Sequence, residues 1–300
     1  MLSLIRIWVD RIAARIFSLF AWFSVFLLII ILAGLILKSL PVMRNYGFSE
    51  LLFSAEWKPM QKQFGFLPFI VSTLYVTVTA LVFALPACTL ASLYLVEYAS
   101  RRFTNAVLPI IDILAGIPSV IYGIWGIIVV VPFVRNQVAP LFHAETTGYS
   151  ILAGGLVLAV MVFPLMINLL VEVLRTVPRE LREASLSLGT TRWETSLFVV
   201  LRKALPGIFA AVILAFSRAF GETIAVLMVV GNVVRIPNGV FDSGYPIPAL
   251  IANNYGEMLS IPSYDSALMF AALILLVIII LFNLFSAFIL TKLNVHRFSV

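Results

Sequence analysis

The sequence is poor in charge and contains a single cysteine. Charged residues make up only 11% of its 300 residues, against roughly 25% in soluble domains. Hydrophobic residues make up 62%, and the mean hydropathy is +1.10. A water-facing surface of this size could not hide so much apolar material, which excludes an ordinary soluble enzyme. The chain is therefore predicted to be an integral membrane protein.

Cysteine and histidine are too scarce for a disulfide or a metal centre. Cys88 has no second cysteine to pair with, and the two histidines, His143 and His296, are far apart in the sequence. Protein metal sites normally need three or four ligands. We expect no metal site, and we interpret Cys88 as a small packing residue within a span.

Long stretches without charge indicate the number of spans. A bilayer core about 30 Å thick needs about 20 apolar residues per helix. Five charge-free stretches exceed that length, and a sixth is interrupted only by Arg218 and Glu222. The alternation typical of a membrane barrel is absent. We expect an all-α integral membrane protein with a segment 1–16, a transmembrane domain 17–295 and spans at about 17–37, 69–95, 107–133, 148–171, 207–231 and 267–290.

The distribution of basic residues predicts the orientation. Lysine and arginine in short loops tend to remain in the cytoplasm. Segments on the side of the two termini contain 13 of the 20 basic residues, and the opposite side contains six. Both termini are therefore predicted to be cytoplasmic. This bias also explains the net charge of +6, which does not indicate a nucleic-acid partner.

One cytoplasmic loop, residues 172–206, concentrates charge and predicts two helices. Pro178 suits the first position of a helix, and Gly189 suits its C-terminal cap. The positions between them that share one small or apolar face are Leu181, Ala184, Ser185 and Leu188. The segment from Thr191 to Glu194 has the spacing of a capping box, so a second helix is expected to begin there and to end near Pro206.

Two interpretations of this helix–turn–helix loop remain open. It could be an amphipathic connector that lies on the anionic inner leaflet. Alternatively, it could be a docking element, because a small-residue face allows a partner's groove to approach closely. The glycine corner would then fix the angle between the two helices.

The same loop carries a motif of a known transporter family. Glu183, Ala184 and Ser185, with Gly189 six positions after the glutamate, resemble the EAA loop of permease subunits in binding-protein-dependent ABC importers. The sequence departs from the family pattern where Ser185 replaces the second alanine and Arg202 stands in place of a proline. The resemblance implies that an ATPase subunit docks on the coupling helix. The residues that this would involve are Arg182, Glu183, Ala184 and Gly189.

Further stretches resemble the phosphate-specific importers, and the permease of the PstC type in particular. The matching stretches are 114–123 (LAGIPSVIYG), 218–223 (RAFGET), and Ala225-Val226 followed by Gly231-Asn232. The sister PstA type usually continues with Ala-Pro after the second stretch, which this chain does not. The resemblance implies a PstA-type sister permease, two ATP-binding-cassette ATPase subunits, a phosphate-binding protein and surrounding lipid as partners. It also implies a multi-pass location in the bacterial cytoplasmic (inner) membrane, with ATP and magnesium bound only by the ATPase partner.

Arg218 and Glu222 are the informative charges within the spans. An ionisable group there costs about 2.5–3.5 kcal/mol. Four positions apart on one helix face, the two side chains could pair. They could merely neutralise each other, or they could line a polar path, as charges in spans commonly do. The planar guanidinium of Arg218 suits phosphate oxygens, and Glu222 is expected to pair with it while the path is empty.

A third charge in a span, Asp112, is better explained by a structural partner than by transport. It lies ten positions after Arg102, near the expected inner boundary of the third span. Gly116 and Pro118 follow in the same span and permit a kink.

The favoured hypothesis is a permease subunit without catalytic residues. The chain lacks a Gly-x-x-x-x-Gly-Lys-Ser/Thr phosphate loop, so separate subunits would hydrolyse ATP. A permease for another oxyanion, such as molybdate or sulfate, remains open. A self-contained secondary transporter would require matching features in two repeated halves, and charges in the fifth span have no counterparts in the second. An intramembrane enzyme would require a motif such as His-Glu-x-x-His, which is absent.

Overall fold

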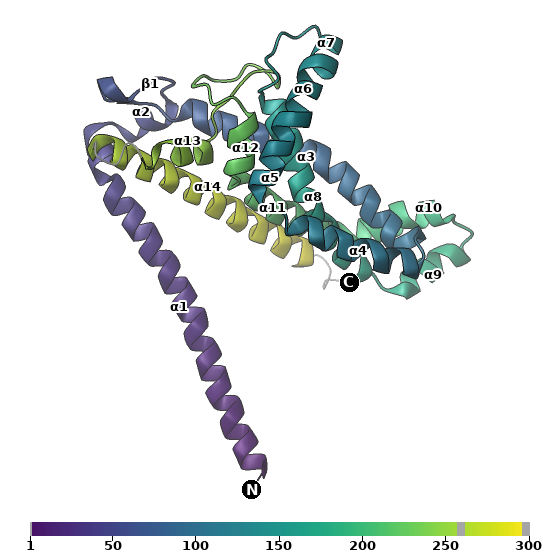
Figure 1. Ribbon diagram of the computed structural model, residues 1–300. Helices are drawn as coiled ribbons and strands as arrows, with labels where there is room; N and C mark the ends of the chain where they lie inside the picture. Colours follow the sequence, from purple (N-terminus) through teal and green to yellow (C-terminus); the bar gives the residue numbers. More distant parts are fainter. Residues whose placement is uncertain (1, 257–261, 296–300) are drawn as a thin grey trace.

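The computed structural model describes residues 2–256 and 262–295, and in this part of the chain helices dominate (Figure 1). Six helical segments are long and apolar enough to cross a membrane, which confirms the predicted all-α fold with six spans. The spans begin with α1 (Leu2–Asn45) and α3 (Leu67–Leu93), which η2 (Tyr94–Tyr98) extends. They continue with a rod formed by α5 (Ser119–Trp125), η3 (Gly126–Val130), α6 (Val131–Phe133), η4 (Val134–Val138) and α7 (Ala139–Leu141). The last three spans are α8 (Ile151–Arg175), a rod of α10 (Arg192–Glu194), η5 (Thr195–Leu201) and α11 (Arg202–Phe220), and α14 (Pro262–Val295).

Shorter elements connect the spans. The first outer segment contains α2 (Phe48–Phe53) and a small antiparallel hairpin of β1 (Trp57–Lys58) and β2 (Gln63–Phe64), joined by η1 (Pro59–Gln61). The other connecting helices are α4 (Arg101–Ala115), α9 (Arg179–Ser187), α12 (Ile224–Val229) and α13 (Ile247–Asn254). The hairpin and α13 lie at one end of the molecule, and α9 and α10 lie at the other (Figure 1).

The centre of the molecule is the contact between α3 and α8. A Cβ atom added at Gly155 of α8 would lie 2.5 Å from the Thr79 side chain of α3, so the two backbones approach closely only because glycine stands there. A Cβ atom added at Gly207 of α11 would likewise lie 2.5 Å from the Val173 side chain of α8. Small residues commonly permit such close packing in membranes. The resulting core includes Val76, Leu158, Met166 and Ala211, which are all buried.

The first span, α1, leaves the body of the protein. Figure 1 shows its N-terminal part projecting away from the other helices. Only its C-terminal part packs on neighbours, where Ser39 and Val42 are buried. Large apolar side chains such as Phe17 and Trp22 are more than 70% exposed within the chain. Lipid or another membrane subunit must cover these side chains, because apolar surface of this extent cannot face water.

The third span differs from its expected range of 107–133. The helix is broken after α4, at residues 116–118, and resumes with Ser119. Proline at position 118 lacks the N–H that a continuous helix would use, so the ladder is interrupted. The Tyr122 hydroxyl donates a hydrogen bond to the Leu114 carbonyl at 2.9 Å, and this bond satisfies one acceptor that the break leaves free. The kink that the sequence permitted is therefore a defined structural break.

The helix of the fifth span is unbroken, and it begins and ends earlier than the expected range of 207–231. Its helix starts at Arg192 and runs through Pro206 without interruption to Phe220. The expected end of a separate second helix near Pro206 is wrong, since a proline inside an apolar span is tolerated. Gly221 ends the helix, and the polypeptide resumes as α12 only at Ile224.

Aromatic side chains fasten the outer segment to the spans. Trp57 contacts the rings of Phe64, Phe66 and Phe69 edge-on, with centroids 5.5, 5.2 and 4.9 Å away. These rings pack on Phe69 of α3 and on Tyr264 and Phe270 of α14.

Candidate functional site

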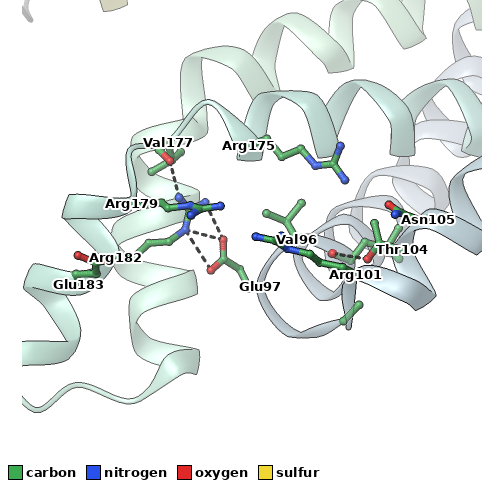
Figure 2. A pocket seen from close by; sticks show the side chains of 12 residues that line it. Val96, Glu97, Arg101, Thr104, Asn105, Arg175, Val177, Arg179, Arg182 and Glu183 are labelled. Atoms are coloured by element: carbon green, nitrogen blue, oxygen red, sulfur yellow. Dashed lines mark hydrogen bonds and ion pairs between the residues drawn. The ribbon is translucent and has the colours of Figure 1, made fainter.

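A nearly buried ion pair connects α9 to the end of the second span. The Arg182 guanidinium donates to both carboxylate oxygens of Glu97, with Nε and Nη2 at 3.0 and 2.9 Å from Oε1 (Figure 2). The side chains are only 17% and 12% exposed. Arg182 also donates to the backbone carbonyls of Leu174, at 3.0 Å, and Val177. A single arginine thus joins α9, the end of α8 and η2.

The engagement of Arg182 changes its expected role. Its donors are directed at Glu97 and at carbonyl groups of its own chain, so the guanidinium is not available as a free charge for a partner. The other predicted coupling residues, Glu183, Ala184 and Gly189, are exposed. Arg182 therefore positions α9, and its neighbours form the accessible surface.

Hydroxyl groups fix the turn between α9 and α10. The Ser185 hydroxyl lies 2.9 Å from that of Thr190 and 3.0 Å from that of Thr195. The serine that replaces an alanine of the family motif thus has a structural reason. Gly189 adopts a left-handed conformation with φ +85°, which favours glycine. This residue gives the turn its sharp corner.

The predicted capping box at the start of α10 is confirmed. The Thr191 hydroxyl accepts a bond from the Glu194 amide at 3.2 Å, and the Glu194 carboxylate accepts one from the Thr191 amide at 2.8 Å. These reciprocal bonds satisfy two amides at the helix start. The turn and the helix that follows it are therefore held in one geometry.

Several large apolar side chains of this element are exposed among its charged residues. Leu188 is 85% exposed, and Leu181, Leu186 and Trp193 are also exposed. Leu181 and Leu188 belong to the helix face that the sequence predicted, whereas Ser185 of that face is buried. An apolar surface on a rigid helix pair is typical of a site for a partner protein.

Arg218 and Glu222 do not pair in the described chain, which corrects the expectation from their spacing. The helix ends at Phe220, so Glu222 is no longer four positions along the same helix face. Instead, its Oε1 accepts a bond from the Ala225 amide at 3.4 Å. Glu222 is thus directed to the beginning of α12, where a carboxylate is favourable.

Arg218 is exposed and has neither a hydrogen bond nor an ion pair within residues 2–256 and 262–295. Its neighbours on α11 face the protein: Phe216 contacts the tilted ring of Phe282 with centroids 4.2 Å apart, and the Ser217 hydroxyl accepts a bond from Asn283 at 3.2 Å. Arg218 shares the exposed stripe of α11 with Leu214. The guanidinium therefore projects from a firmly packed helix toward space that this chain does not fill.

Asp112 has the structural partner that the sequence interpretation favoured. Its carboxylate accepts a hydrogen bond from the Asn168 amide at 2.7 Å, which connects α4 to α8. Over the described residues, no group of three or more histidine, cysteine or acidic side chains could bind a metal.

The sequence interpretation did not identify Glu97 and Asn168 as structural residues. Glu97 directly follows a charge-free stretch that begins at residue 63. A carboxylate at the end of a span is a sequence signal for a structural partner. Its pairing with Arg182, 85 residues away, was not available from local spacing. Asn168 is an uncharged polar residue in an apolar helix, which is a weak signal for a partner.

Comparisons with known proteins agree with this architecture. Residues 84–295 match the family described as binding-protein-dependent transport system inner membrane component. The chain belongs to this family. Six of its helical segments are long and apolar enough to cross a membrane, so it is a multi-pass protein of the cytoplasmic membrane.

Individual relatives match most of the chain. It is 34% identical over 261 residues to "Phosphate transport system permease protein PstC" of Xylella fastidiosa (strain 9a5c), covering 82% of this chain and 78% of the relative. It is 33% identical over 298 residues to "Probable phosphate transport system permease protein PstC" of Methanocaldococcus jannaschii, covering 94% of each. A chain of the inward-facing MetNI methionine ABC transporter shares the fold, with a TM-score of 0.54, 20% identity, and coverage of 79% of this chain and 99% of that chain.

Proposed function

We propose that this chain is the permease subunit of an ATP-driven importer of inorganic phosphate. In this proposal it pairs with a sister permease, receives phosphate from a binding protein on the outside, and docks two ATPase subunits on the inside. Its family membership and its relatives named as phosphate transport permeases support this assignment. The same family membership favours the importer over a self-contained secondary transporter.

The exposed guanidinium of Arg218 is the observation that carries the proposal. A charge inside a span is costly, and Arg218 has no partner of its own within the described residues to offset that cost. Its helix is held by contacts on the opposite face, such as the Phe216–Phe282 contact. A phosphate oxyanion can accept two parallel bonds from the guanidinium. Arg218 is then the residue that binds phosphate transiently during its passage.

The structure also revises the proposed role of Glu222. Because its carboxylate is directed to the Ala225 amide, it does not need to be displaced before phosphate reaches Arg218. Glu222 instead stabilises the break between α11 and α12 and keeps a negative charge near the path. This arrangement favours weak binding, because the carboxylate repels an anion that stays close.

Energy would arrive through α9 and α10. The apolar surface around Leu188 is suited to a groove on an ATPase subunit. Movement of that subunit would displace α9, and the Arg182–Glu97 pair would transmit the displacement to the end of the second span. The chain itself then needs no bound ATP or magnesium.

Loss of ATPase binding on mutation tests the docking part of the proposal. Gly189→Asp introduces a side chain at a left-handed position that favours glycine and changes the corner of the docking surface. Glu183→Lys reverses an exposed charge on α9. Both variants are expected to reduce co-purification of the ATPase subunit at least tenfold while the sister permease is retained.

A charge reversal elsewhere provides the control. Glu145→Lys changes an exposed residue outside the loop 172–206, and it should co-purify with the ATPase as well as the wild type. Normal ATPase recovery with both α9 variants would contradict the docking proposal. Loss of the sister permease in the same variants would point to misfolding instead, and thermal unfolding of the purified chain separates that case.

Other oxyanions are the second candidate cargo. The guanidinium fork of Arg218 fits any tetrahedral anion with two accessible oxygens. Sulfate and molybdate are therefore also suited to bind at this site. The names of the relatives favour phosphate. Competition between these anions during uptake distinguishes them.

A further inference from the structure

A cavity of about 680 Å³ lies beside the Arg182–Glu97 pair (Figure 2). Its wall comes from four parts of the chain: the end of the second span, the first turn of α4, the end of α8 and the start of α9. These are segments that the distribution of basic residues assigns to the cytoplasmic side. Arg218 is not among the lining residues, so the cavity is separate from the proposed transport path.

The lining of this cavity has an excess of positive charge. Four arginines, Arg101, Arg175, Arg179 and Arg182, face two glutamates, Glu97 and Glu183. The Glu97 carboxylate accepts bonds from Arg182, so its charge is already compensated. Only Glu183, which is exposed, remains to balance the other three arginines.

These three arginines have no partner in the part of the chain that the structure describes. Arg101, Arg175 and Arg179 make no hydrogen bond or ion pair there. Figure 2 shows them around the cavity, each from a different helix. Their like charges repel one another, and an anion bound between them would offset that repulsion. Asn105 adds an exposed amide to the same wall.

We propose that this cavity is a second anion site, which binds a phosphate group through Arg101, Arg175 and Arg179. Guanidinium groups bind phosphate oxygens by charge-assisted, often bidentate, hydrogen bonds. Two sources share this chemistry: free inorganic phosphate in the cytoplasm and the headgroup of an acidic phospholipid, which basic pockets between spans are suited to bind. Because the arginines belong to α4, α8 and α9, an anion between them ties α9 to the spans. Occupancy of the cavity would thereby stiffen the proposed docking element.

The sequence offers a matched pair of arginines for the test. Arg101 and Arg102 are neighbours in the first turn of α4 and both are exposed, but only Arg101 lines the cavity. The chain, purified with its sister permease, is placed in nanodiscs of pure phosphatidylcholine and titrated with radiolabelled inorganic phosphate. A parallel preparation contains phosphatidylglycerol, and native mass spectrometry counts the phosphatidylglycerol that each complex retains.

The proposal predicts one occupied site in at least one of the two arms. Saturable phosphate binding identifies the free anion, and a retained phosphatidylglycerol identifies the lipid. In either arm, Arg101→Gln and Arg175→Gln should weaken binding about tenfold each, which corresponds to about 1.4 kcal/mol for the loss of one charge-assisted bond. Arg175→Lys should recover part of the affinity, and Arg102→Gln should leave it unchanged. Arg218→Gln should also retain the site, which separates this result from the outcome for the transport path.

Three results would overturn the proposal. The wild type could bind neither probe, or Arg102→Gln could weaken binding as much as Arg101→Gln, which would indicate a diffuse surface effect. The site could also disappear in Arg218→Gln, which would place the bound anion in the transport path. Equal unfolding temperatures of the variants in lipid without added anion confirm that a loss of binding is not a loss of folding.

Discussion

Replacing Arg218 by glutamine is expected to lower phosphate uptake by the assembled complex about 100-fold. The substitution removes the charge and the paired donors, which would contribute about 3 kcal/mol to binding the passing anion. Since the Arg218 side chain is exposed and has no partner within the described residues, the fold and the assembly should not change. Uptake of radiolabelled phosphate into proteoliposomes, normalised to the amount of complex, measures the effect.

Two further substitutions make the Arg218 experiment specific. Arg218→Lys retains the charge but not the planar fork, so it should transport at a rate between the wild type and Arg218→Gln. Arg15→Gln removes an exposed arginine from α1 and should have no effect on uptake. Undiminished uptake by Arg218→Gln in a normally assembled complex would exclude Arg218 from the path.

Breaking the Arg182–Glu97 pair should lower the free energy of unfolding more than removing any of the exposed charges does. Glu97→Gln leaves the guanidinium, only 17% exposed, without its counter-charge. Removing one partner of a buried ion pair costs about 3–5 kcal/mol, and the residual exposure places this pair near the lower end of that range. We expect α9 to detach locally from η2, so that its amides exchange with deuterium faster and ATP hydrolysis no longer drives uptake efficiently.

A double-mutant cycle separates the pair from its surroundings. Glu97→Gln combined with Arg182→Gln should cost less than the sum of the two single substitutions, since the partners contact each other. The Lys58–Glu56 pair, whose side chains are 53% and 60% exposed, is the internal control and should contribute less than about 1 kcal/mol. Additive costs at Glu97 and Arg182, with unchanged exchange in α9, would contradict the role assigned to the pair.

Local signals in the sequence predicted local structure well. The capping box at Thr191 and Glu194 and the glycine corner at Gly189 depend on neighbouring residues, and both are present as expected. The number of spans followed from apolar length alone. These features required no knowledge of how distant segments meet.

The remaining features depend on contacts or breaks that spacing does not reveal. The apolar stretch around Arg218 continues past residue 220, so nothing in its hydropathy indicated that the helix ends at Gly221. The expected Arg218–Glu222 pair failed for that reason. The Arg182–Glu97 pair requires the ends of two segments 85 residues apart to meet. Its detection needed the packing of α9 on η2, which only the three-dimensional structure provides.

ATP-dependent phosphate uptake by the reconstituted complex is the most direct test of the central claim. Proteoliposomes that contain this chain, the sister permease and the ATPase subunits, with the binding protein outside, should accumulate phosphate only when ATP is hydrolysed. Excess sulfate or molybdate should not compete. The chain without the ATPase subunits should not transport phosphate at all. Phosphate flux through this chain alone would contradict the assignment as an importer permease.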